Sequence, residues 1–231
     1  MKTIGLLGGM SWESTAVYYQ LLNQLVREKL GGLHSAKVIM HSFNFDEIVA
    51  CQKAGEWDKA TAILLDAARK MEASGAELLL ICTNTMHTLA PEIEAGINIP
   101  LVHIADVTAE AMQEKGVRKA ALLGTLYTME QDFYRERLNK HGVDVIVPSV
   151  EERQCVHNII FDELCQGVFT EGSRDRYRQI MSQLAEQQGA EGIILGCTEI
   201  PLLVRAEDAS VPLFDTTYLH AKKAVEMALI S

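Results

Sequence analysis

Residues 189–197 (GAEGIILGC) decide the fold, because they repeat residues 75–83 (GAELLLICT) at an offset of 114 positions, from 83 to 197. Each stretch begins with a Gly-Ala-Glu turn, and a short apolar run that is typical of a buried strand comes next. A shorter match joins residues 6–8 (LLG) to residues 122–124 (LLG), at an offset of 116 positions, from 6 to 122. Any two buried strands followed by polar turns can look alike, but two matches in the same order at similar offsets predict a duplicated domain.

Short apolar runs alternate with amphipathic stretches along the whole chain, a pattern typical of parallel sheets covered by helices. In the first half, strands are expected at residues 3–7, 36–42 and 77–81, and helices at 14–27 and 57–73. In the second half, strands are expected at 100–103, 119–123, 143–147 and 192–195, and helices at 107–114, 129–140 and 151–187, the last broken near 167–172. A final helix at 217–230 is expected to pack on the first domain. We predict an α/β protein with one domain at 1–98 plus 208–231 and another at 99–207.

Composition limits the class of partner. The chain has 231 residues, 48% of them hydrophobic, and a formal net charge of −10. This is enough apolar material for one large core or two small ones. The negative charge disfavours nucleic acid, since phosphate contacts need clustered Lys and Arg. The apolar runs are too short to span a membrane, and the first residues lack the regions of a signal peptide. We predict a cytoplasmic protein that binds a small molecule.

The five cysteines are an odd number without close pairing, so reduced thiols are expected. The sequence has no CxxC pair, HExxH helix or His-Cys cluster, and no metal is predicted. Cys51, Cys155 and Cys165 fall in helical stretches and are interpreted as packing residues. Cys82 is expected to be buried by strand alternation.

Polar side chains follow both repeated strands at the point where each strand ends. Cys197 is expected at a strand-to-helix turn beside backbone N–H groups, which stabilise a thiolate, although an inert core cysteine is the alternative. Thr83 begins a run of donors and acceptors that continues with Asn84 and Thr85, and it fits both a helix N-cap and a substrate-binding residue. His87 fits packing, hydrogen bonding or catalysis. Because ligands of open α/β sheets bind at the carboxyl ends of strands, we expect a functional site at these positions.

The first turn of the chain places glycines between a strand and a helix, in residues 5–11 (GLLGGMS). The backbone amides around Met10 and Ser11 are candidates to receive a carboxylate there. The stretch does not fit GxGxxG, so a dinucleotide cofactor is not predicted.

Taken together, residues 4–10 (IGLLGGM), 84–87 (NTMH) and 196–201 (GCTEIP) resemble the aspartate/glutamate racemase family over essentially the whole chain. The resemblance implies two pseudo-symmetric α/β domains with the active site in the cleft between them, and usually a homodimer. It also implies racemisation without pyridoxal phosphate or another cofactor, in which two residues flank the α-carbon and exchange its proton. The implied catalytic residues are Thr83 and Cys197. The expected substrate-binding residues are Met10, Ser11, Gln52, Asn84, Thr85 and Thr198.

The sequence departs from the family pattern at two positions. The family's first cysteine is replaced by Thr83, whose hydroxyl is a weaker acid and base than a thiol. We therefore expect Cys197 to deprotonate the L-substrate, with Thr83 on the opposite face. Residues 8–15 (GGMSWEST) match the opening of a branch specific for L-aspartate and L-glutamate. A family lysine that helps bind the side-chain carboxylate is replaced by Cys165, which predicts a broader range that includes homoserine.

Other functions fit the same residues. A maleate-isomerase-like enzyme or a decarboxylase of the same superfamily would use Cys197 on a related dicarboxylate. A non-catalytic amino-acid-binding protein would keep the pocket without the thiol expected at Thr83. A pyridoxal enzyme is a further alternative, because a Schiff-base lysine has no short universal motif.

Overall fold

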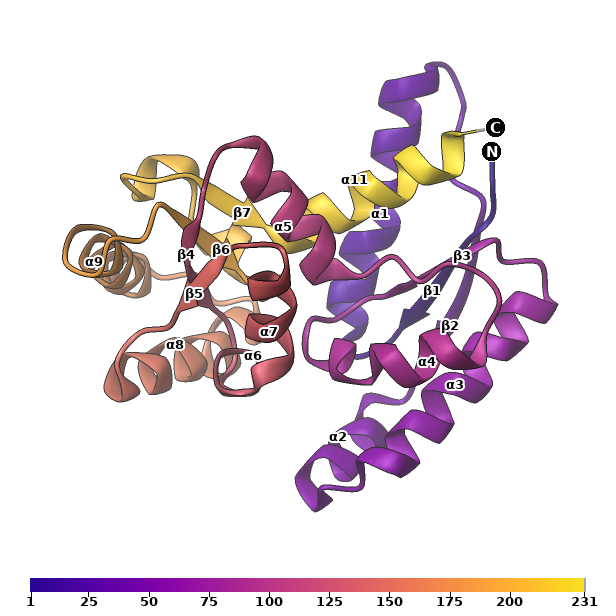
Figure 1. The fold of residues 1–231 in the computed structure, drawn as a ribbon, viewed down its shortest axis with the longest axis horizontal. Helices are drawn as coiled ribbons and strands as arrows, with labels where there is room; N and C mark the ends of the chain where they lie inside the picture. Colours follow the sequence, from indigo (N-terminus) through magenta and orange to yellow (C-terminus); the bar gives the residue numbers. More distant parts are fainter. Residues whose placement is uncertain (231) are drawn as a thin grey trace. The chain divides into compact units, whose positions relative to one another are not determined.

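A computed structural model describes residues 1–230, which form two compact units, each built on its own parallel sheet (Figure 1). The first unit comprises Met1–His103 and the chain from His220 onward, and the second comprises Ile104–Leu219. The α/β fold with parallel sheets flanked by helices is therefore as predicted. No helix within residues 1–230 is long and apolar enough to cross a membrane.

The first unit contains a three-stranded sheet in the order β2-β1-β3. Its elements are β1 (Ile4–Gly8), α1 (Trp12–Leu30), β2 (Val38–Ser42), α2 (Phe45–Ala54), α3 (Trp57–Ala73), β3 (Leu78–Ile81), the 3₁₀ helix η1 (Thr85–Leu89), α4 (Ala90–Gly96) and most of α11 (Thr216–Leu229). Figure 1 shows α1 on one side of this sheet, and α3 and α4 on the other.

Strand alternation builds the core of the first unit. Leu7, Leu79 and Ile81 belong to one apolar cluster with residues of α2, α3 and α4. The helix α3 was predicted at these bounds because its buried positions, among them Leu64 and Met71, recur at helical spacing. The apolar side chains are buried on the faces of the sheet. The polar residues therefore lie in the loops at the carboxyl ends of the strands.

The second unit contains a four-stranded parallel sheet in the order β5-β4-β6-β7. Its elements are α5 (Ile104–Glu114), β4 (Lys119–Leu123), α6 (Leu126–Glu130), α7 (Asp132–Lys140), β5 (Asp144–Ile146), α8 (Val150–Asp162), η2 (Leu164–Gln166), α9 (Glu171–Glu186), β6 (Gly192–Leu195), α10 (Ile200–Leu203), η3 (Ala206–Asp208) and β7 (Leu213–Asp215).

The repeated sequences occupy equivalent places in the two sheets. β1 lies between β2 and β3 with Leu7 opposite Ile81, and β4 lies between β5 and β6 with Leu123 opposite Leu195. Because each repeated strand runs beside the central strand of its sheet, Thr83 and Cys197 each lie two residues beyond an equivalent register position.

The repeated glutamates have the same structural role. The Glu77 carboxylate accepts a hydrogen bond from the Thr3 amide at 2.7 Å, and the Glu77 amide donates to the Thr3 carbonyl at 2.8 Å. The Glu191 carboxylate accepts from the amides of Arg118 and Lys119 at 2.7 and 3.1 Å. These backbone donors lower the pKa of Glu191. Each glutamate thus fastens the start of its strand to the start of the central strand.

The fourth strand of the second sheet corresponds to a single β-bridge in the first sheet. Ile193 pairs with Leu213 of β7, whereas Leu79 makes a single isolated bridge to Leu101. The prediction of a full strand at 100–103 was therefore wrong. Strand β7 was not predicted, and because it pairs with β6, the second unit extends beyond residue 207 to Leu219.

The helix expected at 129–140 is divided in the structure. Gln131, with an extended ψ of 142°, ends α6 and precedes α7. The other expected elements differ from the observed ones mainly at their ends, and the strands at 119–123 and 192–195 have the predicted bounds.

Candidate active site

The turn after β1 brings backbone amides to the carboxyl edge of the first sheet. Gly9 has a φ of 83°, and a Cβ there would lie 2.4 Å from the carbonyl oxygen of Phe43. Glycine is therefore required for this close approach. The Gly9 amide donates to Thr15 Oγ1 at 2.8 Å. Within the described chain, the amides of Met10 and Ser11 have no protein acceptor, which leaves two donors at the N-terminus of α1.

The loop after β3 lies at the same edge. Ser14 Oγ of α1 donates to the carbonyl of Cys82 at 3.0 Å, which fastens the end of β3 to the first turn of α1. Cys82 is fully buried, as predicted, and burial raises the pKa of its thiol. Thr83 and Thr85 are half-buried, and Asn84 is buried.

Gln52 reaches this loop from α2. Its Nε2 donates to Met86 Sδ at 3.0 Å, so the Gln52 side chain lies against η1. Met10 itself is only 3% exposed and packs in the apolar cluster, so its backbone rather than its side chain is available to a ligand.

A buried group of three histidines contacts the backbone of Thr83 through His87. His87 Nδ1 donates to the carbonyl of Thr83 at 2.8 Å. The His87 ring lies 4.8 Å from the His103 ring and 5.5 Å from the His220 ring, measured between centroids. All three histidines are buried. His87 therefore fixes the backbone of the residue expected to face the substrate.

His220 has one tautomer that satisfies both of its ring nitrogens. Its Nε2 is 2.7 Å from the carbonyl of Val102, which can only accept, so Nε2 carries the proton. Nδ1 then accepts from the Tyr18 hydroxyl at 2.8 Å. Burial, with the charge of His87 as a smaller cause, lowers the pKa of His220 to about 3. His220 is thus a neutral structural member of this cluster at neutral pH.

In the second unit, Cys197 follows β6 at the carboxyl edge of its sheet. The Gly196 amide donates to the Leu123 carbonyl at 2.7 Å, which continues the pairing of β6 with β4 up to the thiol. Cys197 Sγ donates to Glu199 Oε2 at 2.9 Å, and Thr198 Oγ1 donates to the same oxygen at 2.7 Å. Glu199 is buried, so one carboxylate oxygen accepts from both predicted site residues.

The environment of Cys197 differs from the expected one. Burial of the thiol, followed by the charge of Glu199 and its hydrogen bond, raises the pKa of Cys197 well above its ordinary value. A backbone N–H of Glu199 acts in the opposite direction, but its effect is smaller. The expectation of a stabilised thiolate was therefore wrong, because desolvation and a carboxylate outweigh the turn's amides. Cys197 is a thiol paired with a potential base.

The structure thus groups the predicted residues within each unit. At the carboxyl edge of the first sheet lie Met10, Ser11, Gln52, Thr83, Asn84 and Thr85; at that of the second lie Cys197 and Thr198. Cys165, at the position where the family resemblance predicts a lysine, is exposed on η2. Within residues 1–230 no group of His, Cys, Asp and Glu side chains is arranged to hold a metal ion.

Sequence reasoning missed two polar groups of the second unit. Asp215 ends β7 opposite Leu195 and accepts from the amides of Thr217 and Tyr218, each at 3.0 Å. Tyr177 of α9 is fully buried, and its hydroxyl has no hydrogen-bond partner within the described chain. Asp215 was missed because its short strand was not predicted. Tyr177 was missed because, in the sequence, it occupies an ordinary apolar position of an amphipathic helix.

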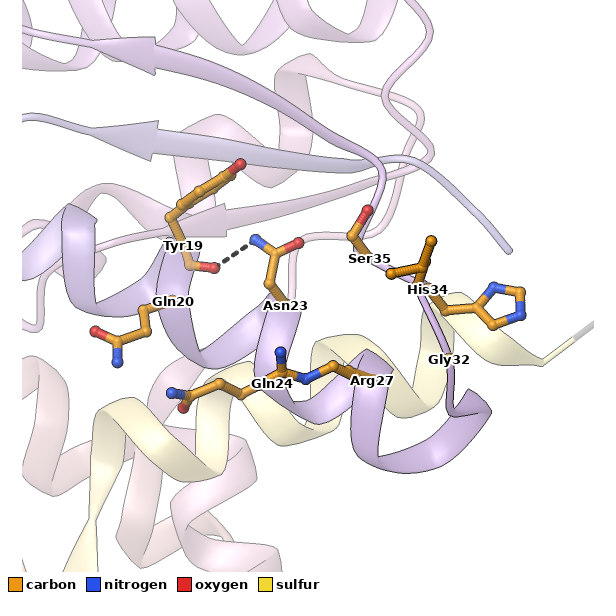
Figure 2. Close-up of a pocket in the computed structure, with 9 residues that line it drawn as sticks. Tyr19, Gln20, Asn23, Gln24, Arg27, Gly32, His34 and Ser35 are labelled. Carbon is orange, nitrogen blue, oxygen red and sulfur yellow. Dashed lines mark hydrogen bonds between the residues drawn. The ribbon is translucent and has the colours of Figure 1, made fainter.

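A pocket of about 480 Å³ lies on the first unit but away from these residues (Figure 2). Its walls are the exposed side of α1, including Tyr19 and Asn23, and the loop from Gly32 to Ser35 that precedes β2. The Asn23 side chain donates to the Tyr19 carbonyl at 2.7 Å, which holds part of this wall (Figure 2). Because that loop enters β2 at the amino end of the strand, the pocket is not at the edge that carries Thr83.

A duplicated strand arrangement, with a thiol–carboxylate pair at the edge of one sheet, defines an α/β protein built from two related units. The family model described as Asp/Glu/Hydantoin racemase matches residues 7–224. The chain belongs to this family, and it is an isomerase of the racemase type.

Similar proteins agree with this assignment. A crystal structure from Yersinia pestis, described as a candidate Asp/Glu racemase, has 54% identity and a TM-score of 0.95 over 99% of this chain and 100% of that one. An aspartate racemase homologue from Pyrococcus horikoshii OT3 has 38% identity and a TM-score of 0.90 over 99% of each chain. The broad specificity amino-acid racemase RacX of Bacillus subtilis (strain 168) is 22% identical over 227 residues, 98% of each chain.

Proposed function

We propose that this protein racemises amino acids without a cofactor, and that Cys197 removes the α-proton of the L-enantiomer. The observation that carries the proposal is the hydrogen bond of 2.9 Å from Cys197 Sγ to Glu199 Oε2. In the resting protein the thiol holds its proton, so it is not yet a base. Transfer of that proton to Glu199 would generate the thiolate, which then takes the α-proton of the substrate.

The first unit supplies donors suited to the substrate's α-carboxylate. The unsatisfied amides of Met10 and Ser11 lie at the start of α1, where backbone N–H groups and the helix dipole favour an anion. We propose that they bind this carboxylate, and that Gln52, Asn84, Thr85 and Thr198 provide further polar contacts to the amino acid. Gln52 and the residues after β3 support this role because they share one sheet edge.

Thr83 is proposed to serve the opposite face of the α-carbon. A threonine hydroxyl is too weak an acid to give up a proton alone, so it would donate to the carbanion while receiving a proton from a second donor such as water. The hydrogen bond from His87 to the Thr83 carbonyl supports this role, since it fixes the backbone that carries the hydroxyl. With a thiol on one face and a hydroxyl on the other, the two directions are expected to differ in rate.

The proposed substrates are L-aspartate and L-glutamate, with neutral amino acids such as homoserine in addition. The Pyrococcus horikoshii protein, an aspartate racemase homologue, supports an acidic substrate. The Bacillus subtilis relative of broad specificity supports a wider range. The exposed Cys165, in place of a cationic lysine, removes one source of selectivity for a second carboxylate.

We also propose that the protein acts in the cytoplasm as a homodimer. The odd number of cysteines, five without close pairing in the sequence, supports reduced thiols in a reducing compartment. Light scattering of the purified protein would determine its molar mass in solution, and twice the chain mass of 25.6 kDa is the expected result.

The test of the activity is exchange of the α-proton. The protein is incubated in D₂O with each enantiomer of aspartate, glutamate and homoserine, and loss of the α-proton is followed by NMR alongside chiral chromatography. We expect exchange and inversion of the L-enantiomers, lost in Cys197→Ala and retained in Cys155→Ala, whose thiol lies on α8. Absence of exchange with all six compounds would contradict the proposal.

A further inference from the structure

Thr198 separates Cys197 from Glu199 in the chain, and its hydroxyl has a defined partner. Thr198 Oγ1 donates to Glu199 Oε2 at 2.7 Å, the same oxygen that accepts from Cys197 Sγ at 2.9 Å. A hydroxyl has one hydrogen, and here Glu199 receives it. Thr198 can therefore still accept a hydrogen bond from the α-ammonium of a substrate, but it cannot donate to a substrate carboxylate without releasing Glu199.

The Glu199 side chain depends on these two hydrogen bonds. Glu199 is buried and precedes α10, and its carboxylate makes no capping hydrogen bond to that helix. Within the described residues, no basic side chain forms an ion pair with Glu199, and its carboxylate accepts from Cys197 and Thr198. A buried carboxylate without a cation requires hydrogen-bond donors to offset its loss of water.

The two hydrogen bonds to Glu199 Oε2 differ in strength. A thiol is a weak donor, whereas a hydroxyl that donates to a carboxylate forms a charge-assisted hydrogen bond, with typical O···O distances of about 2.5–2.7 Å. The bond from Thr198 is therefore the stronger anchor of this oxygen. A carboxylate oxygen has lone pairs for more than one donor, so the Cys197 proton can move along its own hydrogen bond while Thr198 remains bound.

The equivalent loop of the first unit is held differently. At the offset of 114 positions, Thr198 and Glu199 correspond to Asn84 and Thr85, so the loop after β3 has no carboxylate at this place. There His87 donates to the backbone carbonyl of Thr83. The anchored carboxylate thus occurs in the loop that carries the thiol and not in its counterpart.

On the basis of the proposed function, we propose that Thr198 is a positioning residue whose hydroxyl holds Glu199 Oε2 within hydrogen-bond distance of the Cys197 thiol. The thiol proton passes to Glu199 along the existing hydrogen bond, and the Cys197 thiolate then takes the α-proton of the substrate. No proton passes to or from Thr198. Without the Thr198 hydroxyl, the Glu199 side chain gains rotational freedom, and Oε2 spends less time within reach of Sγ.

The test compares Thr198→Val, which removes the hydroxyl at nearly constant size, with Thr198→Ser, which retains a hydroxyl. Alkylation of Cys197 by iodoacetamide is measured without substrate between pH 6 and 11, with peptide mass spectrometry to separate Cys197 from the other thiols. Because Glu199 raises the pKa of Cys197, a displaced carboxylate should let Thr198→Val alkylate about tenfold faster at a given pH on the rising limb. Thr198→Ser is expected to recover the native alkylation profile.

Proton exchange of L-aspartate completes this comparison. In Thr198→Val the kcat for exchange should fall about tenfold, because the thiol proton loses its acceptor for much of the time, and Thr198→Ser should recover most of it. A native kcat and native alkylation profile with a raised KM would overturn the inference, since Thr198 would then contact only the substrate. Alkylation requires no racemase activity, so failure of the proposed function would be seen separately, as absent exchange in the native protein.

Combining Thr198→Val with Glu199→Gln shows whether Thr198 acts through Glu199. If it does, the double variant should match Glu199→Gln alone in both alkylation and exchange, because residues that act as one unit are not additive. A loosened loop would instead make Cys197 of the double variant alkylate faster than in Glu199→Gln. That result, or a further loss of exchange of about tenfold beyond Glu199→Gln, would overturn the inference.

Discussion

Cys197 and Glu199 form a direct thiol–carboxylate pair, in which Sγ donates to Oε2 at 2.9 Å. The pair has two opposed effects. The negative charge of Glu199 raises the pKa of Cys197 and so keeps the thiol protonated. The same oxygen is placed to take the thiol proton when a substrate arrives. We therefore propose that the carboxylate opposes the thiolate at rest and serves as its base during turnover.

Glu199→Gln should separate these two effects. Without the negative charge, the pKa of Cys197 falls, so iodoacetamide should alkylate Cys197 faster at pH 8 than in the native protein. Without the base, the α-proton exchange of L-aspartate should fall by about 100-fold, the usual contribution of a general base. Alkylation quenched at fixed times measures the first rate, and NMR of the α-proton measures the exchange rate. Faster alkylation with undiminished exchange would show that Glu199 is not the base.

The sequence predicted the strands and helices that have a strong hydrophobic pattern of their own. It did not predict those that form only because they pair with a neighbouring strand. Strand 192–195 was predicted because it is a pure apolar run, and its burial is complete. Strand β7 has only three residues, directly after Pro212, and becomes a strand because it pairs with β6. Residues 100–103 have a similar pattern, yet form one bridge, to Leu79.

The same distinction holds for the candidate site. Motifs after the repeated strands made Thr83 and Cys197 candidates, because topology places strand ends at one edge of each sheet. The raised pKa of Cys197 was not predictable, since it depends on how far the thiol is desolvated and where the Glu199 side chain points. The unsatisfied hydroxyl of Tyr177 could not be predicted either, because it is visible only when its neighbours are known.

Thr83→Cys should change the balance between enantiomers. A thiol is a far better acid and base than a threonine hydroxyl, so a cysteine at this position would provide a second independent base. We expect α-proton exchange of D-aspartate to increase by at least about tenfold, with a smaller change for L-aspartate. Thr83→Ser, which keeps a hydroxyl, is the matched control and should resemble the native protein. Equal rates for D-aspartate in the Cys and Ser variants would show that Thr83 does not face the α-carbon.

His220 should make the stability of the protein sensitive to acid. Its pKa is lowered from 6.5 to about 3 in the folded protein, so the unfolded chain binds a proton more readily. The stabilisation from neutral His220 is complete above pH 6.5 and is lost as the pH falls towards 3, at up to about 1.4 kcal/mol per pH unit. Urea unfolding between pH 7 and pH 4 measures this slope.

The matched variant for this prediction is His220→Gln, which keeps polar atoms but does not titrate. It is expected to be less stable than the native protein at pH 7, because the hydrogen bonds to Tyr18 and Val102 are disturbed. Its free energy of unfolding should depend less steeply on pH in the same interval. Parallel slopes for the two proteins would mean that other groups cause the acid sensitivity.

Gly9→Ala should damage both folding and carboxylate binding. A Cβ at Gly9 would lie 2.4 Å from Phe43 O and 2.5 Å from Phe43 N, and the φ of 83° adds strain for any other residue. Gly116→Ala is the control, since its φ is 71° but no atom lies within 4 Å of the added Cβ. The control is expected to lose about 1 kcal/mol of unfolding free energy from strain alone. Gly9→Ala should lose clearly more, because the backbone of the β1–α1 turn has to move.

That movement displaces the Met10 and Ser11 amides, so the KM for L-aspartate should rise in Gly9→Ala and remain unchanged in Gly116→Ala. Equal stability losses in the two variants, with an unchanged KM, would show that this turn neither requires glycine for packing nor binds the substrate's carboxylate.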